Sequence, residues 1–312
     1  MKILISSIAY NDSIGGIIVL HKLCDTLLRL GFDVGMIPRS DWHYIDDNVL
    51  LRYVKKDDNK WEVQYHMDIL KYFKTNPKYN CRFVTKFDAD RDILLVPEIV
   101  SGNPFGFKNV VRYIMHRSHL NDDMKIAKTW GDNDFWLYYS DWFYDGLKEK
   151  NVLTLLDYKL DIFRDLNLAR DLESCFILGK FHKYKEEYIP IHPKDSIEMP
   201  HRGLNDIQLF ELFNRCKRFY SYDTETYLSI MAALCGCESI IVPRKTISKE
   251  DIINKNPPFK YGISYGLDDI DLCNKTRPQL RPFLEELNTQ QIENTKNMFM
   301  KIVDHFSLKQ NT

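Results

Sequence analysis

Two glycines near the start of the chain could bind a phosphate. Gly15 and Gly16 place unhindered backbone at the beginning of a predicted helix, where free N–H groups and the helix dipole favour a phosphate or an acidic sugar group. The spacing does not match the dinucleotide fingerprint G-x-G-x-x-G. A tight strand-to-helix turn without a ligand would explain the same two glycines, so both interpretations stay open.

A basic turn follows a predicted strand in the second half of the chain. It contains Lys180, Lys183 and Lys185, with His182 among them. Cations at the end of a buried strand could stabilise a leaving diphosphate. A solvated loop is the alternative, because most charge runs face water.

The segment 219–237 carries the most informative residues of the chain. Tyr222, Asp223 and Thr224 fall at a predicted strand-to-helix junction. Side chains at such a junction can cap the helix, and they can also hydrogen-bond ribose or phosphate oxygens. Capping and packing would account for these residues without a ligand, so the binding role is a hypothesis.

Glu98 and His116 end two predicted strands in the first half of the chain. Either residue could act as a general base or bind an acceptor, and a structural role is the alternative. His182, His192 and His201 have neither an i, i+4 spacing nor a zinc pattern. We therefore predict no metal site.

The composition excludes several classes of protein. The 312 residues carry 43 Lys and Arg against 44 Asp and Glu, with a net charge of -1 and a pI near 6.8, which argues against a general nucleic-acid binder. No apolar run is long enough to span a bilayer, and the first residues resemble a buried strand rather than a signal peptide. We expect a cytoplasmic protein whose seven scattered cysteines are reduced.

The elements that must position these residues alternate between β-rich runs and amphipathic helices, the pattern of α/β layers with parallel sheets. The length predicts two domains. We expect residues 39–91 to form loops and short helices. The predicted strands are 2–8, 33–37, 92–97, 109–115, 135–140, 174–178, 218–222 and 239–242, and the predicted helices are 15–30, 141–150, 205–216, 225–234 and 282–306.

At these positions the sequence resembles bacterial and viral glycosyltransferases of the GT-B architecture, in particular a group related to the retaining family that includes sucrose and glycogen synthases. The matching stretches are 15–16 with the following helix, 96–104, 109–113, 175–183 and 219–243. The resemblance implies two Rossmann-like domains that face each other across a cleft. It implies an acceptor-binding domain at 1–150, a nucleotide-sugar-binding domain at 151–281, and a C-terminal helix at 282–312 that packs back on the first domain.

The resemblance also implies roles for individual residues. Lys180 and Lys183 would hold the diphosphate, and His116 stands where many relatives carry a histidine near the transferred sugar. The other donor-binding residues would be Gly15, Gly16, Tyr222, Asp223 and Thr224. Relatives carry a second acid, which contacts ribose, where this chain has Met231, and Glu225 is a possible substitute.

We therefore expect a glycosyltransferase, typical of polysaccharide biosynthesis, that moves a sugar from a nucleotide-diphosphate donor to a glycan or lipid-linked acceptor. Its catalytic residues would be His116, Glu98 and Lys180. By resemblance the reaction would retain the anomeric configuration without a metal or any cofactor besides the donor. Peripheral membrane contact stays open. The alternatives are a catalytically silent protein of this fold that binds a glycan or nucleotide, and a nucleotide-sugar epimerase.

Overall fold

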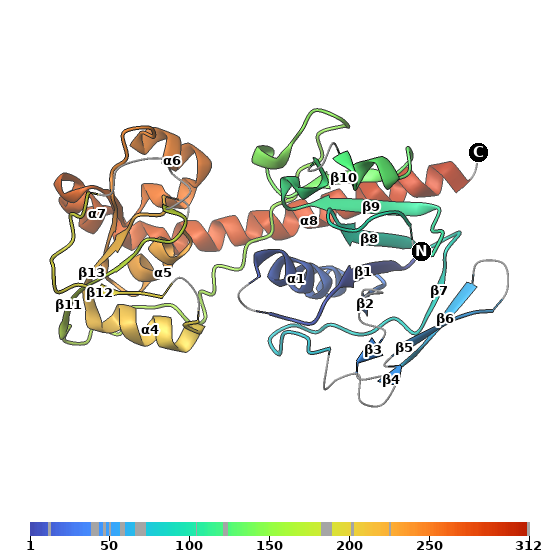
Figure 1. The fold of residues 1–312 in the computed structure, drawn as a ribbon, viewed down its shortest axis with the longest axis horizontal. Coiled ribbons are helices and arrows are strands. Elements are labelled where there is room, and N and C mark those ends of the chain that lie inside the picture. The colour runs from blue at the N-terminus through green and yellow to red at the C-terminus, as the bar shows by residue number, and fades with distance from the viewer. Residues whose placement is uncertain are drawn as a thin grey trace. The chain divides into compact units, whose positions relative to one another are not determined.

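The chain forms two compact units in the computed structural model (Figure 1). The first comprises Met1–Asp157 with Asn288–Thr312, and the second comprises Tyr158–Leu287. The structure describes residues 1–11, 14–38, 44–45, 48–49, 51–56, 60–65, 73–103, 105–120, 124–181, 189–200, 203–224 and 226–310.

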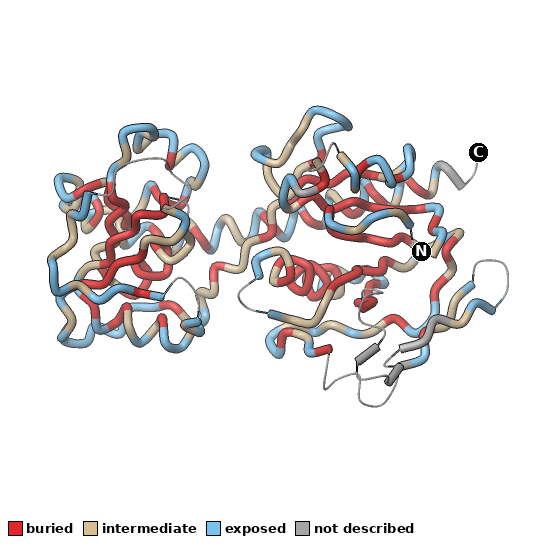
Figure 2. Tube along the Cα trace, in the orientation of Figure 1, coloured by how far each residue is buried: buried red, intermediate tan, exposed pale blue. Residues whose placement is uncertain are grey.

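The first unit is built on a five-stranded, all-parallel sheet with strand order β10-β9-β8-β1-β2. Every residue of these strands is buried, as Figure 2 shows, which is why they appear in the sequence as short apolar runs. The strands are β1 (Ile3–Ser7), β2 (Val34–Pro38), β8 (Ile93–Pro97), β9 (Asn109–Ile114) and β10 (Phe135–Tyr138). All five confirm predicted strands, with small shifts at the ends.

The helix α1 (Gly15–Arg29) follows β1 and confirms the predicted βαβ opening. Its residues Leu20, Leu23 and Leu27 are buried and belong to the core cluster that also contains Ile3 and Ile5 of β1. The regularly spaced apolar residues of this helix therefore face the sheet, as their periodicity indicates.

The prediction of loops and short helices for residues 39–91 is wrong where the structure describes strands, whereas residues 73–85 are mostly turns and irregular chain, as expected. The antiparallel strands β5 (Leu51–Lys55), β6 (Lys60–Tyr65) and β7 (Lys86–Asp88) form one small sheet, and β3 (Tyr44–Ile45) pairs with β4 (Asn48–Val49). Trp61 of β6 stacks on Phe87 of β7 with 6.2 Å between ring centroids. Cross-strand aromatic contacts of this kind stabilise a sheet without a helical period.

The predicted helix at 141–150 is also wrong. Only a short 3-10 turn, η4 (Asp141–Phe143), forms after β10. Gly146 has a left-handed backbone with φ of +79°, and the side chain of Asp145 accepts hydrogen bonds from Tyr138 and from the backbone of Leu147. This turn and the contact of Asp145 with the distant His119 override the local helical pattern.

The second unit contains another five-stranded, all-parallel sheet, in the order β12-β11-β13-β14-β15. Its strands are β11 (Leu172–Ile177), β12 (Ile197–Glu198), β13 (Cys216–Ser221), β14 (Glu238–Ile241) and β15 (Ile263–Tyr265). Its helices are α4 (Asp206–Arg215), α5 (Leu228–Leu234), α6 (Lys249–Lys255) and α7 (Ile270–Thr276). The two parallel sheets confirm the α/β class, while the GT-B arrangement stays a prediction.

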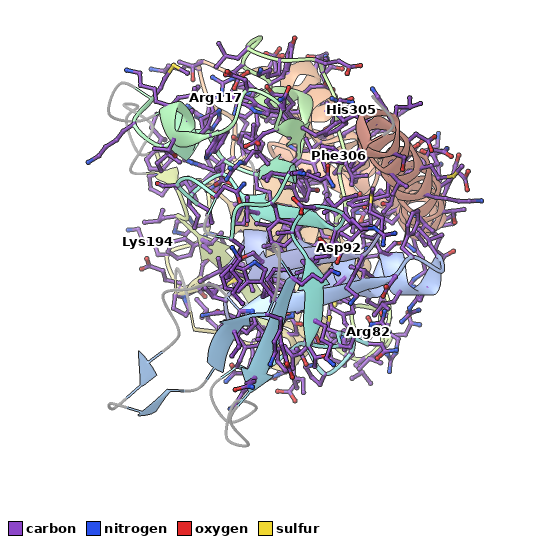
Figure 3. All side chains as sticks on the ribbon, turned by 90° about the vertical axis from the view of Figure 1, so that its right-hand side faces the viewer. Arg82, Asp92, Arg117, Lys194, His305 and Phe306 are labelled. Atoms are coloured by element: carbon purple, nitrogen blue, oxygen red, sulfur yellow. The ribbon has the colours of Figure 1, made fainter. Side chains whose placement is uncertain are left out.

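The last helix, α8 (Leu280–Gln310), contributes to the core of the first unit. Phe299, Ile302 and Phe306 are buried there with residues of β1 and β10, and the ring of Phe306 lies 6.5 Å from that of Phe135. Figure 3 shows Phe306 projecting from the C-terminal part of this helix. The first unit is therefore assembled from two segments that lie far apart in the sequence.

All seven cysteines have free thiols, and six of them are buried. No helix in the described part of the chain combines the length and the apolar character needed to cross a bilayer.

Candidate functional site

The turns after β11 and β13 meet at one edge of the second sheet. These strands are parallel neighbours, so their carboxyl ends lie side by side. The backbone N–H of Lys180 donates to Oδ2 of Asp223 over 3.1 Å. The structure thus brings together two of the residues that the sequence assigned to the donor site.

Gly179 is required by the geometry of this contact. Its φ is +56°, in the left-handed region, and a Cβ at this position would lie 2.7 Å from Cβ of Asp223. Only a residue without a side chain fits both the backbone conformation and the close approach. The turn therefore presents its backbone, and the side chain of Lys180 is exposed beside it.

Asp223 and Thr224 are almost fully buried, with 4% and 1% exposure. The hydroxyl of Ser221 donates to the backbone oxygen of Asp223 over 2.7 Å and fixes the turn. Within the described residues, Oγ1 of Thr224 is buried and has no hydrogen-bond partner. A buried hydroxyl without a partner is costly, and a bound ligand or water could satisfy it.

Tyr222 packs inside the second unit instead of presenting its hydroxyl at the edge. It is 2% exposed, and its hydroxyl accepts from the backbone N–H of Ile191 over 2.9 Å and lies 2.7 Å from Nδ1 of His192. Burial lowers the pKa of His192. Tyr222 therefore supports the turn through packing, while Lys183 and Glu225 lie outside the described residues.

The first unit brings Glu98, Gly16 and the end of β9 to the corresponding edge of its own sheet. The carboxylate oxygen Oε2 of Glu98 accepts from the backbone N–H of Met115 over 3.1 Å. A Cβ on Gly16 would lie 3.4 Å from Cε of Met115. Met115 thus connects the turn after β8 with the start of α1.

Glu98 has the properties of a proton-transfer group. It is 5% exposed, and burial raises the pKa of its carboxyl, an effect that the Met115 N–H opposes only in part. A carboxyl with a raised pKa can exchange a proton closer to neutral pH. The neighbouring His116 is exposed, and its ring lies 6.3 Å from that of Phe143.

The N-terminus of α1 begins without a side-chain cap. Ile14 occupies the cap position in an extended conformation and offers no hydrogen-bonding side chain, and a Cβ on Gly15 would have nothing within 4 Å. Neither Gly15 nor Gly16 has a left-handed backbone, so these glycines are not needed for the turn itself. Among the described residues, the space beside Gly15 is compatible with an anion at this helix N-terminus.

A buried contact between His119 and Asp145, which the sequence did not indicate, supports the carboxyl edge of the first sheet. Nε2 of His119 lies 2.9 Å from Oδ2 of Asp145, and the ring of His119 stacks on Trp130. His119 belongs to the 3-10 turn η2 (Arg117–Leu120) directly after His116. Its partner is 26 residues away in the sequence, so no spacing pattern could have predicted the pair.

A pocket of about 380 Å³ lies at the opposite edge of the second sheet, where β11, β13 and β14 begin. Its charged groups serve the fold: Arg170 donates to the carbonyls of Phe213, Cys216 and Cys235, and Arg218 pairs with Glu238 over 2.8 Å. Because these strands end far from where they begin, this pocket is separate from the turn of Lys180 and Asp223.

Comparison with known proteins adds little to this geometry. No family model matches the chain, and no curated protein matches it. Among solved structures, MurG of Acinetobacter baumannii is similar over 100% of both chains, at 10% sequence identity and a TM-score of 0.31. A TM-score this low does not establish a common fold, so the assignment of a site rests on the residues described above.

Proposed function

We propose that the protein is a glycosyltransferase that moves a sugar from a nucleotide-diphosphate donor to a glycan or lipid-linked acceptor. The observation that carries this proposal is the presence of two chemically different clusters, each at the carboxyl edge of a separate parallel sheet. Such edges are the usual ligand-binding positions of α/β sheets. One cluster suits an anion, and the other contains a buried carboxyl that can exchange a proton.

The second unit would bind the donor. The diphosphate would lie against the turn of Gly179 and Lys180, where the exposed side chain of Lys180 can stabilise the charge that develops on the leaving group. Asp223 orients this turn through its contact with the Lys180 N–H. Thr224 offers a hydroxyl that has no partner among the described residues.

The first unit would supply the proton acceptor. Glu98 would take the proton of the acceptor hydroxyl, and its raised pKa makes the carboxylate a stronger base than an exposed glutamate. His116 would bind the acceptor nearby. Retention of configuration, which the family resemblance implies, stays a prediction: a base role for Glu98 suits direct displacement with inversion, and NMR of the product anomer distinguishes the two.

A donor-hydrolysis assay tests the proposal. The protein is incubated with UDP-, GDP- and dTDP-sugars, and with a CMP-sugar as a monophosphate comparison, and released nucleotide is measured. We expect one donor to be hydrolysed, and we expect K180A and D223A each to reduce release on the order of 10²-fold, because D223A removes the acceptor of the Lys180 N–H. K217A removes an exposed lysine at the other edge of the same sheet and serves as the matched control. Equal release by all four proteins would refute the donor site.

A catalytically silent nucleotide-binding protein is the second candidate. Met231 of α5 stands where the family that the sequence resembles would carry a ribose-binding acid, and it is 6% exposed and packed in the core. This apolar side chain cannot replace a carboxylate as a hydrogen-bond acceptor. Nucleotide binding that depends on Asp223, without release from any donor or transfer to any acceptor, would favour this candidate.

A further inference from the structure

Trp142 differs from the other aromatic residues in its exposure. It is 59% exposed, and every other Phe, Tyr or Trp whose burial the structure describes is buried or half-buried. A large aromatic surface left in water is characteristic of a contact site for another molecule.

The position of Trp142 places it at the candidate acceptor edge. It lies in η4, directly after β10, and β10 is the parallel neighbour of β9. The turns after these strands are joined by Arg117, whose Nη2 donates to the backbone oxygen of Trp142 over 2.7 Å. Figure 3 shows Arg117 on the segment that follows β9.

The guanidinium of Arg117 lies next to the indole ring, with 5.9 Å between its central carbon and the ring centroid. Among the described residues, the acid beside Trp142 in sequence, Asp141, is paired with Lys150 over 2.5 Å. Within the described residues, a positive charge therefore lies beside an exposed aromatic face, and this arrangement suits a ligand with both an apolar face and a negative group.

Buried contacts hold the turns of Arg117 and Trp142 in place. The turn of Arg117 is anchored by His119, which contacts Asp145 and stacks on Trp130. Tyr138, the last residue of β10, donates to the same carboxylate over 2.7 Å. A surface that is ordered before binding loses less entropy when a ligand arrives.

The surroundings of Trp142 favour a sugar over a lipid surface. In the segment 141–150, Trp142 and Leu147 are the exposed large apolar residues, and Asp141, Lys148, Glu149 and Lys150 are exposed charged residues. A membrane contact would need a broader apolar area. A saccharide ring has one apolar C–H face bordered by hydroxyls, which matches a single indole among polar groups.

We propose that Trp142 and Arg117 form an acceptor platform: the apolar face of a sugar ring stacks on the indole, and a carboxylate or phosphate of the same glycan binds Arg117. This inference rests on the proposed glycosyltransferase function and narrows its acceptor to an acidic glycan. Trp142 and Arg117 are binding residues in this proposal, and the proton transfer belongs to Glu98.

Calorimetric titration of the full chain with defined glycans tests the platform. The probes are a hyaluronan tetrasaccharide, which carries carboxylates, a mannose-phosphate oligosaccharide, which carries phosphate, and chitotetraose, which is neutral. We expect an acidic probe to bind about tenfold or more tightly than the neutral one. W142A should weaken its binding about tenfold or more, and W142Y should restore most of the affinity, because the stacking face is kept.

The variant R117Q should remove the preference for acidic probes. Its matched control is R164Q in the second unit, where an exposed arginine also lies over an aromatic ring, at 5.6 Å from Phe210. This control should bind glycans like the unchanged protein. Circular dichroism of each variant shows whether the fold is kept.

Failure of the platform is distinguishable from failure of the proposed function. Absence of binding by every probe, or equal binding by W142A, overturns the platform even if donor hydrolysis is found. Glycan binding that depends on Trp142 and Arg117, in a protein that binds no nucleotide and hydrolyses no donor, supports the platform and overturns the transferase proposal.

Discussion

The carboxyl edges of the two parallel sheets are built in different ways. At both edges a buried carboxylate accepts from a backbone N–H: Asp223 from Lys180 in the second unit, and Glu98 from Met115 in the first. The second unit adds the left-handed Gly179, whereas the first adds the side-chain contact of His119 with Asp145. A left-handed glycine fixes the backbone of a turn, whereas the raised pKa of Glu98 suits a proton transfer.

One ion pair from each unit gives a second comparison. Arg112 and Asp134 form an ion pair in the first unit with side chains only 1% and 9% exposed. In the second unit, Lys217 and Glu173 pair with both side chains about half exposed. Buried pairs depend on both partners, whereas exposed pairs contribute little to stability.

The largest expected effect is on the buried pair. R112M leaves the carboxylate of Asp134 buried without its partner and should lower the free energy of unfolding by about 3–5 kcal/mol. K217M, in the exposed pair, should change it by less than about 0.5 kcal/mol. Urea denaturation followed by circular dichroism measures both, and similar losses in the two variants would contradict the contrast.

The two glycine turns give the next largest difference. G179A should destabilise the protein by at least about 1–2 kcal/mol, because a left-handed backbone disfavours alanine and the new Cβ would meet Asp223. G15A has open space and an ordinary backbone, so it should be nearly neutral. Thermal unfolding of the two variants makes the comparison, and an equal drop in Tm would show that the turns have the same constraint.

The two units also differ in the capping of a helix, and we expect a smaller effect on stability from this difference. Asn205 caps α4, with its side chain accepting from the backbone of Gln208 over 3.0 Å, while α1 has no side-chain cap. N205A should cost about 1 kcal/mol, and I14A should cost less, since no cap is lost. The test is urea unfolding of both variants, where a larger loss for I14A would argue against this assignment.

The smallest effect should come from Glu98, and its sign depends on pH. The folded pKa is raised, so the folded state binds more protons than the unfolded chain in the window between the ordinary pKa, about 4.3, and the folded value. Stability therefore falls as pH rises through that window and stays lower above it.

Replacement of Glu98 by Gln keeps an acceptor for the Met115 N–H and removes the titration. We expect E98Q to be slightly more stable than the unchanged protein above the folded pKa and equal to it at pH below about 4. Tm measured across pH checks this, and a pH-independent difference would mean that burial of the charge is not the cause.

The parallel strands were predictable because complete burial leaves an apolar run in the sequence. Lys180 and Asp223 were each predicted to follow a strand, but their contact was not predicted, because it depends on which strands are neighbours in the sheet. Strand β6 was missed although residues 60–65 alternate between polar and apolar types. The role of Tyr222 was not predictable, since its partner His192 lies 30 residues away and no local pattern marks it.

The first unit consists of two separate segments of the chain, so its folding depends on when each segment leaves the ribosome. Phe299, Ile302 and Phe306 complete the core around β1, and Lys22 of α1 donates to the carbonyl of Leu156 and to the side chain of Asn288. A ribosome releases the chain from its N-terminus, and domains tend to fold as they emerge. The second unit, which is continuous, can thus fold while translation proceeds, whereas the unit whose strands appear first must wait for the final helix.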